Sequence, residues 1–317
     1  MRVKGLTPSG KPLLVILGPT GAGKTAVAEE AARILSGEII SADAFAVYRG
    51  FDIGTAKPAA ARRAEVPYHL IDVAEAGESF SAGRWAALAR KAADEIARRG
   101  RLPIVCGGSG FYISALLEGL PPGEAKEERL RSLLTAWARR NPEAARRTLE
   151  VNDPVSAARI SPGNLRYFVR ALEILLVTGS PASARKPPAP PFGDCWRVIK
   201  VGIAPPREVL YAKIQDRVRE MLNAGWVEEV RRLLESGLPL DSTSFQAIGY
   251  REVADWVLGR AERAETETKI VTATRRLAKR QRTWLSREPG VLWLRPEEAL
   301  PAILALLERS GETERSG

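Results

Sequence analysis

The sequence has few residues that bind metals or form disulfides. It contains two cysteines, Cys106 and Cys195, and a single histidine, His69. These residues cannot complete a four-ligand zinc site without carboxylates, and two cysteines give no disulfide framework. We therefore expect any metal to be Mg²⁺ that accompanies a phosphate ligand.

Long apolar segments are absent as well. No stretch approaches the roughly 18 uninterrupted apolar residues that a membrane-spanning helix requires. The first residues, MRVKGLTPSGK, lack the apolar core of a signal peptide. We expect a cytoplasmic protein with no membrane partner. Its 317 residues, of which 45% are hydrophobic, are enough for one large α/β core and a second unit.

The clearest motif is GPTGAGKT, which follows the apolar run LLVIL. Glycine, four residues and then Gly-Lys-Thr, placed between a strand-like run and a helical pattern, is typical of a phosphate loop. The glycines let backbone N–H groups point inward, Lys24 adds an ammonium, and Thr25 offers a hydroxyl to Mg²⁺. A plain glycine-rich turn is the alternative. The motif predicts a polyphosphate site formed by Gly18, Pro19, Thr20, Gly21, Ala22, Gly23, Lys24 and Thr25.

Features of nucleotide hydrolases are missing. The apolar strand pattern LPIVC, 102–106, is followed by GGSGFY and not by the acidic residue that usually holds Mg²⁺. The other candidate, YHLID, ends at Asp72 but is short. No asparagine precedes a lysine, so the Asn-Lys-x-Asp tetrad of GTPases is absent. Nucleotide hydrolysis is therefore not the favoured interpretation.

Strand and helix patterns alternate along much of the chain. Strands are predicted at 13–17, 38–41, 102–106, 196–203 and 291–296, and helices at 24–36, 81–99, 206–236 and 249–287. This alternation predicts a parallel, doubly wound sheet. The Arg-rich segments 124–149 and 162–178 are helical, and PASARKPPAPPFG after them is typical of a semi-rigid linker. We predict an α/β fold: a phosphate-loop NTPase-like core with C-terminal helices, 1–120 and 195–317, and an inserted helical domain, 121–194.

Two polar segments follow predicted strands, where a parallel sheet presents side chains to a ligand. The first, SADAFAVYRGFDIGTAKP, contains Asp43, a candidate general base that could equally be a turn or cap residue. The second, Gly107 to Tyr112, contains Ser109 in a glycine-flanked loop. Those glycines could bring a hydroxyl to the same ligand or only relieve the turn. Neither segment decides between these interpretations alone.

The net charge of +10 is unevenly distributed. From Lys269 to Arg287 there are seven basic residues and no acidic one. An apolar or neutral line can pack on the core while the cations face outward. The line is Ile270, Thr274, Leu277, Gln281 and Trp284, and the cations are Arg275, Arg276, Lys279, Arg280 and Arg282. A solvated surface helix is one interpretation, and a track for a nucleic acid is the other.

Seven blocks in order make the chain resemble the bacterial tRNA dimethylallyltransferase family over nearly its whole length. They are GPTGAGKT, SADAFAVYRGFDIGTAKP, HLID, GGSGFY, RALE, IGYRE and TRRLAKRQRTW. The resemblance implies transfer of a dimethylallyl group from dimethylallyl pyrophosphate to N6 of adenosine 37 in the anticodon loop, in tRNAs that read codons beginning with U. It also implies a phosphate-loop core with an inserted helical domain, in agreement with the layout above.

The resemblance assigns roles to particular residues. Asp43 would take the proton of the adenine amine, Arg217 would add a second cation at the leaving pyrophosphate, and Ser109 stands where the family usually has Thr. Mg²⁺ would bind Thr25 and pyrophosphate oxygens. The expected partners are a tRNA anticodon stem-loop and dimethylallyl pyrophosphate, with the protein acting as a monomer. Matched tRNA-contact positions are Asp43, Ala44, Phe45, Ala46, Ser109, Arg131, Arg166, Arg170, Gln246, Gly249, Arg251, Lys279, Arg280, Gln281 and Arg282.

Some positions depart from the family pattern. Ala44 and Ala46 replace a frequent Ser and Gln, Gly163-Asn164 stands where Asn-Asp is usual, and Tyr167 replaces a frequent Arg. These departures concern details of tRNA contact and not the chemistry. Two other functions remain as alternatives. A small-molecule kinase would need no basic helix, and a non-catalytic nucleic-acid-binding ATPase switch would need a hydrolytic carboxylate.

Overall fold

The computed structural model describes residues 10–120, 128–161, 163–185 and 195–315. The chain divides into two compact units, Met1–Leu117 with Phe192–Gly317, and Glu118–Pro191. The predicted boundaries at 121 and 194, and residues 186–193 of the predicted linker, lie outside the described residues. Within the described part of the chain, no helix is both long enough and apolar enough to cross a bilayer.

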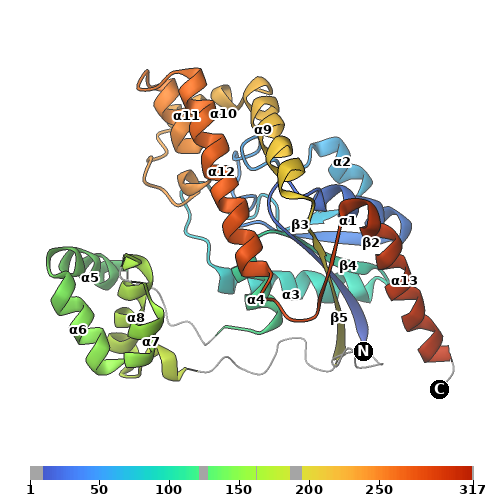
Figure 1. Cartoon of the computed structure of the whole chain (residues 1–317), viewed down its shortest axis with the longest axis horizontal. Coiled ribbons are helices and arrows are strands. Elements are labelled where there is room, and N and C mark those ends of the chain that lie inside the picture. Colours follow the sequence, from blue (N-terminus) through green and yellow to red (C-terminus); the bar gives the residue numbers. More distant parts are fainter. Residues whose placement is uncertain (1–9, 121–127, 162, 186–194, 316–317) are drawn as a thin grey trace. The chain divides into compact units, whose positions relative to one another are not determined.

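The larger unit is built on a six-stranded sheet in the order β3-β2-β4-β1-β5-β6 (Figure 1). Every neighbouring pair is parallel, which confirms the predicted α/β fold. The strands are β1 (Lys11–Leu17), β2 (Gly37–Ala42), β3 (Tyr68–His69), β4 (Leu102–Gly107), β5 (Trp196–Ile203) and β6 (Val291–Leu294).

Helices lie on both faces of this sheet, and further helices pack on one another beyond it. The helices of the larger unit are α1 (Lys24–Ile34), α2 (Ala60–Glu65), α3 (Ala82–Arg98), α4 (Gly110–Leu117), α9 (Arg207–Asn223), α10 (Trp226–Glu235), α11 (Tyr250–Val257), α12 (Arg263–Leu285) and α13 (Pro296–Arg315). Strand side chains alternate between faces. Leu14 and Ile16 of β1 pack in one cluster with residues of α1 and α13, whereas α3 contacts β2 and β4 outside that cluster. Burial on both faces explains why β1 is an uninterrupted apolar run.

Trp85 of α3 fixes the strand end that precedes Asp43. Its indole Nε1 donates a 2.9 Å hydrogen bond to the carbonyl oxygen of Ser41, and its ring stacks on Tyr112 of α4 at 4.9 Å. Trp85 is fully buried. The loops after β2 and β4 are therefore held on a rigid base.

The predicted C-terminal helices are each interrupted once. Gly225, with φ of 99°, separates α9 from α10, and Gly259, with φ of 71°, lies between α11 and α12. Both residues use the left-handed conformation that glycine adopts at low cost. In the larger unit, α2, α4 and α13 had no counterpart among the predicted helices, whereas β3 falls within the candidate strand YHLID.

The smaller unit consists of helices, as the sequence predicts. They are α5 (Glu128–Arg140), α6 (Pro142–Asn152), α7 (Pro154–Arg159) and α8 (Leu165–Thr178). Leu134, Leu149 and Leu172 belong to its own apolar core. Asp153 is buried and accepts hydrogen bonds from the Ser156 and Ser183 backbones. The unit therefore has a core and a polar anchor of its own.

Candidate active site

The phosphate loop lies between β1 and α1. Gly18, Gly21 and Gly23 have positive φ angles of 152°, 79° and 93°. At Gly18 a Cβ atom would lie 2.5 Å from the carbonyl oxygen of Ile203, so only glycine lets the loop pass β5. Helix α1 begins at Lys24, and its first backbone N–H groups point toward the loop. This arrangement suits an anion bound at the end of the helix.

The ammonium group of Lys24 folds back over the loop. Its Nζ atom donates a 2.7 Å hydrogen bond to the carbonyl oxygen of Pro19. Burial lowers the pKa of Lys24 to about 8, with Cys106 and Asp43 opposing the shift and Arg217 adding to it. Since burial destabilises the charged form, an anion in the loop would stabilise the ammonium.

Asp43 lies in the turn after β2. Its Oδ1 atom accepts hydrogen bonds from the backbone N–H groups of Phe45 (2.8 Å) and Ala46 (3.2 Å). Ser109 follows β4, and its Oγ atom accepts a 3.2 Å hydrogen bond from the Ala44 N–H. Because β2 and β4 are neighbouring strands, the two loops meet. Asp43 therefore has the turn role considered from the sequence, through one of its two carboxylate oxygens.

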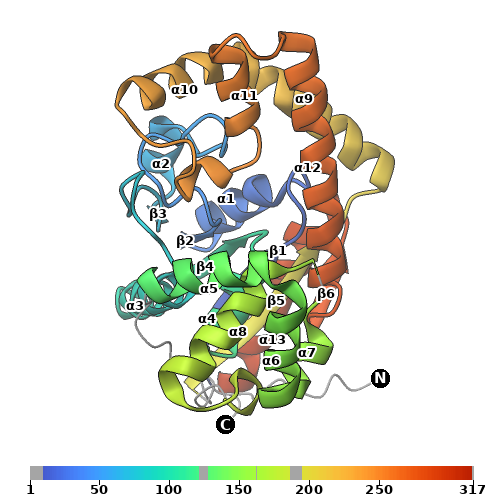
Figure 2. The ribbon, with the colours of Figure 1, turned by 90° about the vertical axis from the view of Figure 1, so that its left-hand side faces the viewer.

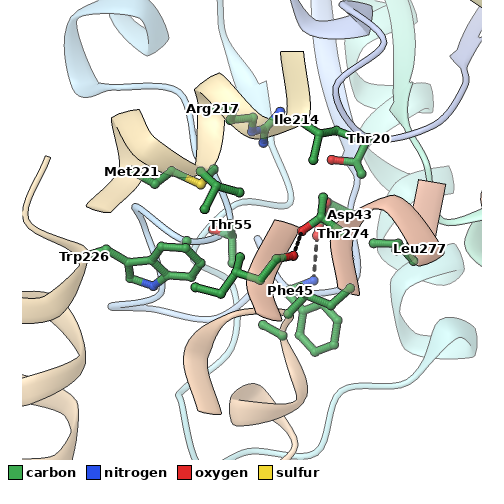
Figure 3. A pocket seen from close by; sticks show the side chains of 15 residues that line it. Thr20, Asp43, Phe45, Thr55, Ile214, Arg217, Met221, Trp226, Thr274 and Leu277 are labelled. Carbon is green, nitrogen blue, oxygen red and sulfur yellow. Dashed lines mark hydrogen bonds between the residues drawn. The ribbon is translucent and has the colours of Figure 1, made fainter. Parts of the chain in front are cut away.

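A cavity of about 90 Å³ adjoins the phosphate loop (Figure 3). Asp43 and Thr20 lie at one end, Met221 and Trp226 at the other, and Arg217 on the wall formed by α9. Burial lowers the pKa of the Arg217 guanidinium, and the Asp43 carboxylate opposes this shift. The remaining lining is mostly apolar: Phe45, Gly54, Thr55, Ile214, Val218, Ala247, Ile248, Ile270, Thr274 and Leu277. The cavity is thus charged at one side and apolar elsewhere.

Trp226 forms the apolar end because two glycines make room for it. A Cβ atom on Gly54 would lie 2.3 Å from the indole, and one on Gly249 would lie 2.1 Å from it. Trp226 is 1% exposed. Trp226 was not among the predicted site residues, although Gly54 lies in SADAFAVYRGFDIGTAKP and Gly249 in IGYRE.

Glu229 connects the two chain segments that hold Trp226. It is buried, and it accepts hydrogen bonds from the N–H groups of Asp52 (3.1 Å) and Ile53 (2.8 Å) and from the Tyr250 hydroxyl (2.6 Å). Burial and the Glu229 carboxylate raise the pKa of Tyr250, so this hydroxyl stays protonated and donates. Glu229 was also missed, because an acidic residue in a helix of a charged protein carries no signal by itself.

The carboxylate of Asp72 forms two ion pairs. Its Oδ1 atom lies 2.6 Å from Lys57 Nζ, and its Oδ2 atom lies 2.9 Å from Arg63 Nη1. Burial alone would raise the pKa of Asp72, but hydrogen bonds and charges from Lys57 and Arg63 outweigh it and lower the pKa. Both carboxylate oxygens therefore serve ion pairs, which argues against a role as the missing hydrolytic carboxylate.

Helix α12 carries the basic segment and packs against α9, α11 and α4. Figure 2 shows it beside α9 and α11. Lys279, Arg280 and Arg282 are exposed. Gln281 accepts a 2.8 Å hydrogen bond from the Thr20 N–H of the phosphate loop and donates a 3.0 Å bond to the Gly108 carbonyl oxygen. The middle of the predicted neutral line of α12 therefore faces the phosphate loop and the cavity.

Two residues of this segment differ from the prediction. Trp284, placed on the packed line, is 49% exposed, because Ala278 and Leu285 supply the buried contacts of that end of the helix. Arg275, placed among the outward cations, lies over the Tyr211 ring at 5.1 Å and bonds the Gln215 side chain at 3.2 Å. The cause is the neighbouring helix α9, which the pattern of α12 alone does not reveal.

The other predicted tRNA-contact residues of the larger unit surround the cavity loops. Ala44 and Phe45 are half-buried and Ala46 is buried in the Asp43 turn. Gln246 is exposed at the end of a short 3-10 turn, Ser244–Gln246, and Gly249 and Arg251 follow it at the start of α11.

In the smaller unit, Arg131 and Arg170 share one carboxylate. Glu173 Oε2 lies 2.6 Å from Arg131 Nη2 and 2.8 Å from Arg170 Nη1. Burial would raise the pKa of Glu173, but the two arginines hold it below its ordinary value. The carboxylate is buried, whereas about a third of each arginine side chain is exposed. Arg166, on the same helix as Arg170, is exposed.

Mg²⁺ at the phosphate loop could share its coordination between the protein and a bound phosphate. The described residues contain no group of three or more His, Cys, Asp or Glu that could hold one. Mg²⁺ takes oxygen ligands, keeps several waters and often shares substrate phosphates. The exposed Thr25 at the start of α1 offers such an oxygen. The donor set therefore fits Mg²⁺ that arrives with a phosphate ligand.

Comparison with known proteins gives a consistent result. A family model described as IPP transferase matches residues 46–288. A tRNA dimethylallyltransferase of Thermomicrobium roseum is 45% identical over 289 residues, covering 89% of this chain and 86% of the relative. One of Roseiflexus castenholzii is 43% identical, covering 89% and 92%.

Two solved structures extend the comparison. The tRNA isopentenylpyrophosphate transferase of Bacillus halodurans is 35% identical, with a TM-score of 0.70, and the match covers 96% of this chain and 98% of that one. A eukaryotic dimethylallyltransferase described as acting on tRNA is 25% identical, with a TM-score of 0.76, covering 91% and 75%. The similarity extends over most of the chain.

Proposed function

The chain belongs to the IPP transferase family, and from that premise we propose that it is a tRNA dimethylallyltransferase. It moves a dimethylallyl group from dimethylallyl pyrophosphate to N6 of adenosine 37 in tRNAs that read codons beginning with U, and it releases pyrophosphate. The observation that carries this proposal is the cavity beside the phosphate loop, where Asp43 and Arg217 face largely apolar walls. We place the enzyme in the cytoplasm, acting as a monomer.

The phosphate loop binds the donor by its pyrophosphate. Negative charge builds on the departing oxygens as the allylic carbon becomes electron-poor, so cations fixed near them stabilise the transition state. The Lys24 ammonium, which folds over the loop, and the Arg217 guanidinium on the cavity wall support this role. Mg²⁺ held by Thr25 and pyrophosphate oxygens would supply further positive charge when bound. The apolar walls exclude water from the dimethylallyl group.

Asp43 acts on the acceptor. The exocyclic amine of adenine is a weak nucleophile because its lone pair is delocalised into the ring. As its nitrogen bonds to the allylic carbon, the Asp43 carboxylate takes a proton from it. Oδ1 of Asp43 already accepts two backbone hydrogen bonds, which fix the carboxylate while Oδ2 receives the proton. The Ala44 N–H holds the Ser109 hydroxyl beside this turn.

The adenine must leave the stacked anticodon loop to reach Asp43. A single-stranded loop permits this flip at low cost. The exposed cations of α12 suit contacts to loop phosphates, as do Arg131 and Arg170 of the smaller unit.

The direct test is the mass of the RNA product. The protein is incubated with an unmodified anticodon stem-loop and either dimethylallyl pyrophosphate or ATP, and the RNA is then weighed and sequenced by fragmentation. We expect the mass of one dimethylallyl group to be added at adenosine 37, and only with the prenyl donor. A mass change that requires ATP, or none with either donor, contradicts the proposal.

Neutralising Lys279, Arg280 and Arg282 together should flatten the salt dependence of tRNA binding. Each phosphate contact on single-stranded RNA contributes a slope of roughly −0.7 in log affinity against log salt, so losing two or three contacts should reduce the slope by about 1.4 to 2. Binding of the donor should not change. The measurement is stem-loop affinity across a salt series.

The matched control neutralises Arg33, Lys91 and Arg98, which are exposed on α1 and α3. Helices that connect parallel strands run antiparallel to them, so Arg33 and Arg98 lie at the sheet edge opposite the phosphate loop. Parallel salt plots for wild type and the α12 variant would show that this helix contributes no phosphate contacts.

Donor affinity should fall as the pH rises through about 8. Burial lowers the pKa of Lys24 to about 8 in the free protein, and bound pyrophosphate favours the charged ammonium and raises that pKa. The affinity for the donor is therefore highest below pH 8. Above pH 8 it decreases by up to tenfold per pH unit. Calorimetric titration with dimethylallyl pyrophosphate, in the absence of RNA, between pH 7 and 9.5 measures this.

Other groups do not explain such a profile. Burial raises the pKa of the Cys106 thiol to about 11, and the last ionisation of a phosphate monoester lies near pH 6. Lys24→Arg serves as the control because a guanidinium remains charged throughout. A flat wild-type profile, or an equal slope in the control, would assign the titration to another group.

A further inference from the structure

The larger unit exposes two aromatic side chains. Among its described residues, Phe111 is 50% exposed and Trp284 is 49% exposed, whereas Trp85, Trp226 and Tyr250 are buried. A large exposed apolar side chain is unremarkable alone, but a contiguous patch commonly marks a binding surface. The position of these two side chains therefore matters.

Trp284 packs against the start of α4, at the residue next to Phe111 in the chain. The Trp284 indole packs directly on Gly110. A Cβ atom at residue 110 would lie 2.2 Å from Trp284 Cδ1 and 2.4 Å from its Nε1, so a larger residue would displace the indole. Phe111 is the next residue along the chain. The last turn of α12 and the first turn of α4 therefore carry two exposed aromatic residues at neighbouring backbone positions.

These positions adjoin the candidate active site. Ser109 immediately precedes Gly110, and Gln281, one turn before Trp284, bonds both Gly108 and Thr20. The nearest part of α12 is basic: Lys279, Arg280 and Arg282 are exposed. An aromatic surface flanked by cations suits a ligand with flat π-faces and a negatively charged backbone.

We propose that Phe111 and Trp284 form a stacking platform for the base of the nucleotide next to the flipped adenine. This inference rests on the proposed function. When one base leaves the anticodon loop, its neighbours lose a stacking partner, and exposed aromatic rings replace it. The charge of α12 selects RNA as the occupant over a second copy of this basic protein, whose like charges would repel.

The experiment uses Phe111→Ala, Trp284→Ala and Trp284→Leu in the full-length protein. Trp284→Leu keeps an apolar contact on Gly110 but has no π-face, so it separates stacking from packing. Leu292→Ala on β6, a residue that is 42% exposed, is the matched control. The RNA is the unmodified stem-loop with 2-aminopurine placed on either side of the target adenosine, because stacking quenches the fluorescence of this base.

We expect each alanine variant, and Trp284→Leu, to weaken stem-loop binding by about 5- to 150-fold and to restore 2-aminopurine fluorescence at one flanking position. The slope of affinity against salt should not change, because no charge is removed. Leu292→Ala should behave as wild type. Thermal unfolding of each variant identifies any that fail to fold.

The outcomes separate this proposal from the proposed function. If wild type binds the stem-loop with quenched fluorescence but adds no dimethylallyl group, the function is wrong and the platform stands. If wild type modifies the RNA while folded variants bind it and quench as wild type does, the platform is refuted. A variant that alters only the oligomeric state would instead show that the aromatic pair contacts a second copy.

Discussion

Asp43→Asn is expected to slow dimethylallyl transfer by roughly 10²- to 10⁴-fold, the usual range for loss of a general base. An asparagine oxygen can accept the same two hydrogen bonds from Phe45 and Ala46, so the turn should survive. The lost property is the ability to take a proton. Single-turnover rates with saturating donor and stem-loop measure the chemical step, and both binding affinities should stay near wild type.

Asp43→Ala distinguishes the two roles of this residue. It removes the turn hydrogen bonds together with the carboxylate. If Asp43 only shaped the turn, the asparagine variant would be nearly as fast as wild type and the alanine variant slow. If Asp43 is the base, both variants are slow, and that pattern alone supports our mechanism.

Lys24→Ala is expected to reduce the transfer rate by about 10²-fold or more and to weaken donor binding. The substitution removes a preorganised cation from the leaving pyrophosphate, and loss of one such group typically has an effect of this order. Since Arg217 remains on the cavity wall, activity should fall without disappearing. Steady-state kinetics across donor concentrations separate the binding effect from the rate effect.

Lys11→Ala provides a control on the same strand. Lys11 is exposed at the opposite end of β1, where it lies over the Trp196 ring. It should affect neither the rate nor donor binding. Wild-type kinetics for Lys24→Ala would mean that the loop serves a ligand other than the prenyl donor.

The sequence predicted best what depends on local pattern. β5 was placed at its observed bounds, because WRVIKVGI is rich in β-branched and aromatic residues and is followed by two prolines. The phosphate loop was likewise evident, since its function requires a particular order of residues. The alternation of strands and helices along the chain also predicted the parallel sheet, because such an alternation is typical of parallel strands joined by crossover helices.

What the sequence missed depends on contacts between distant segments. Trp226 was overlooked because its place in the cavity is set by Gly54 and Gly249, which are far away in the chain. Arg275 follows the outward-facing pattern of α12, yet its guanidinium packs on the Tyr211 ring of α9. Helix α13 escaped detection because Pro301 interrupts its pattern. In each case, a tertiary neighbour or an atypical residue overrode the local signal.

Gln281 has a thermodynamic consequence. Its side chain joins the phosphate loop at Thr20 to the Gly108 loop, and it belongs to α12, the helix whose exposed cations we propose to contact RNA. If donor binding shifts this amide, α12 shifts with it. If RNA binding shifts α12, the hydrogen bond to Thr20 transmits the shift to the phosphate loop. Such coupling is reciprocal: the factor by which donor alters RNA affinity must equal the factor by which RNA alters donor affinity. The order in which the two substrates arrive then changes the path but not the total binding free energy.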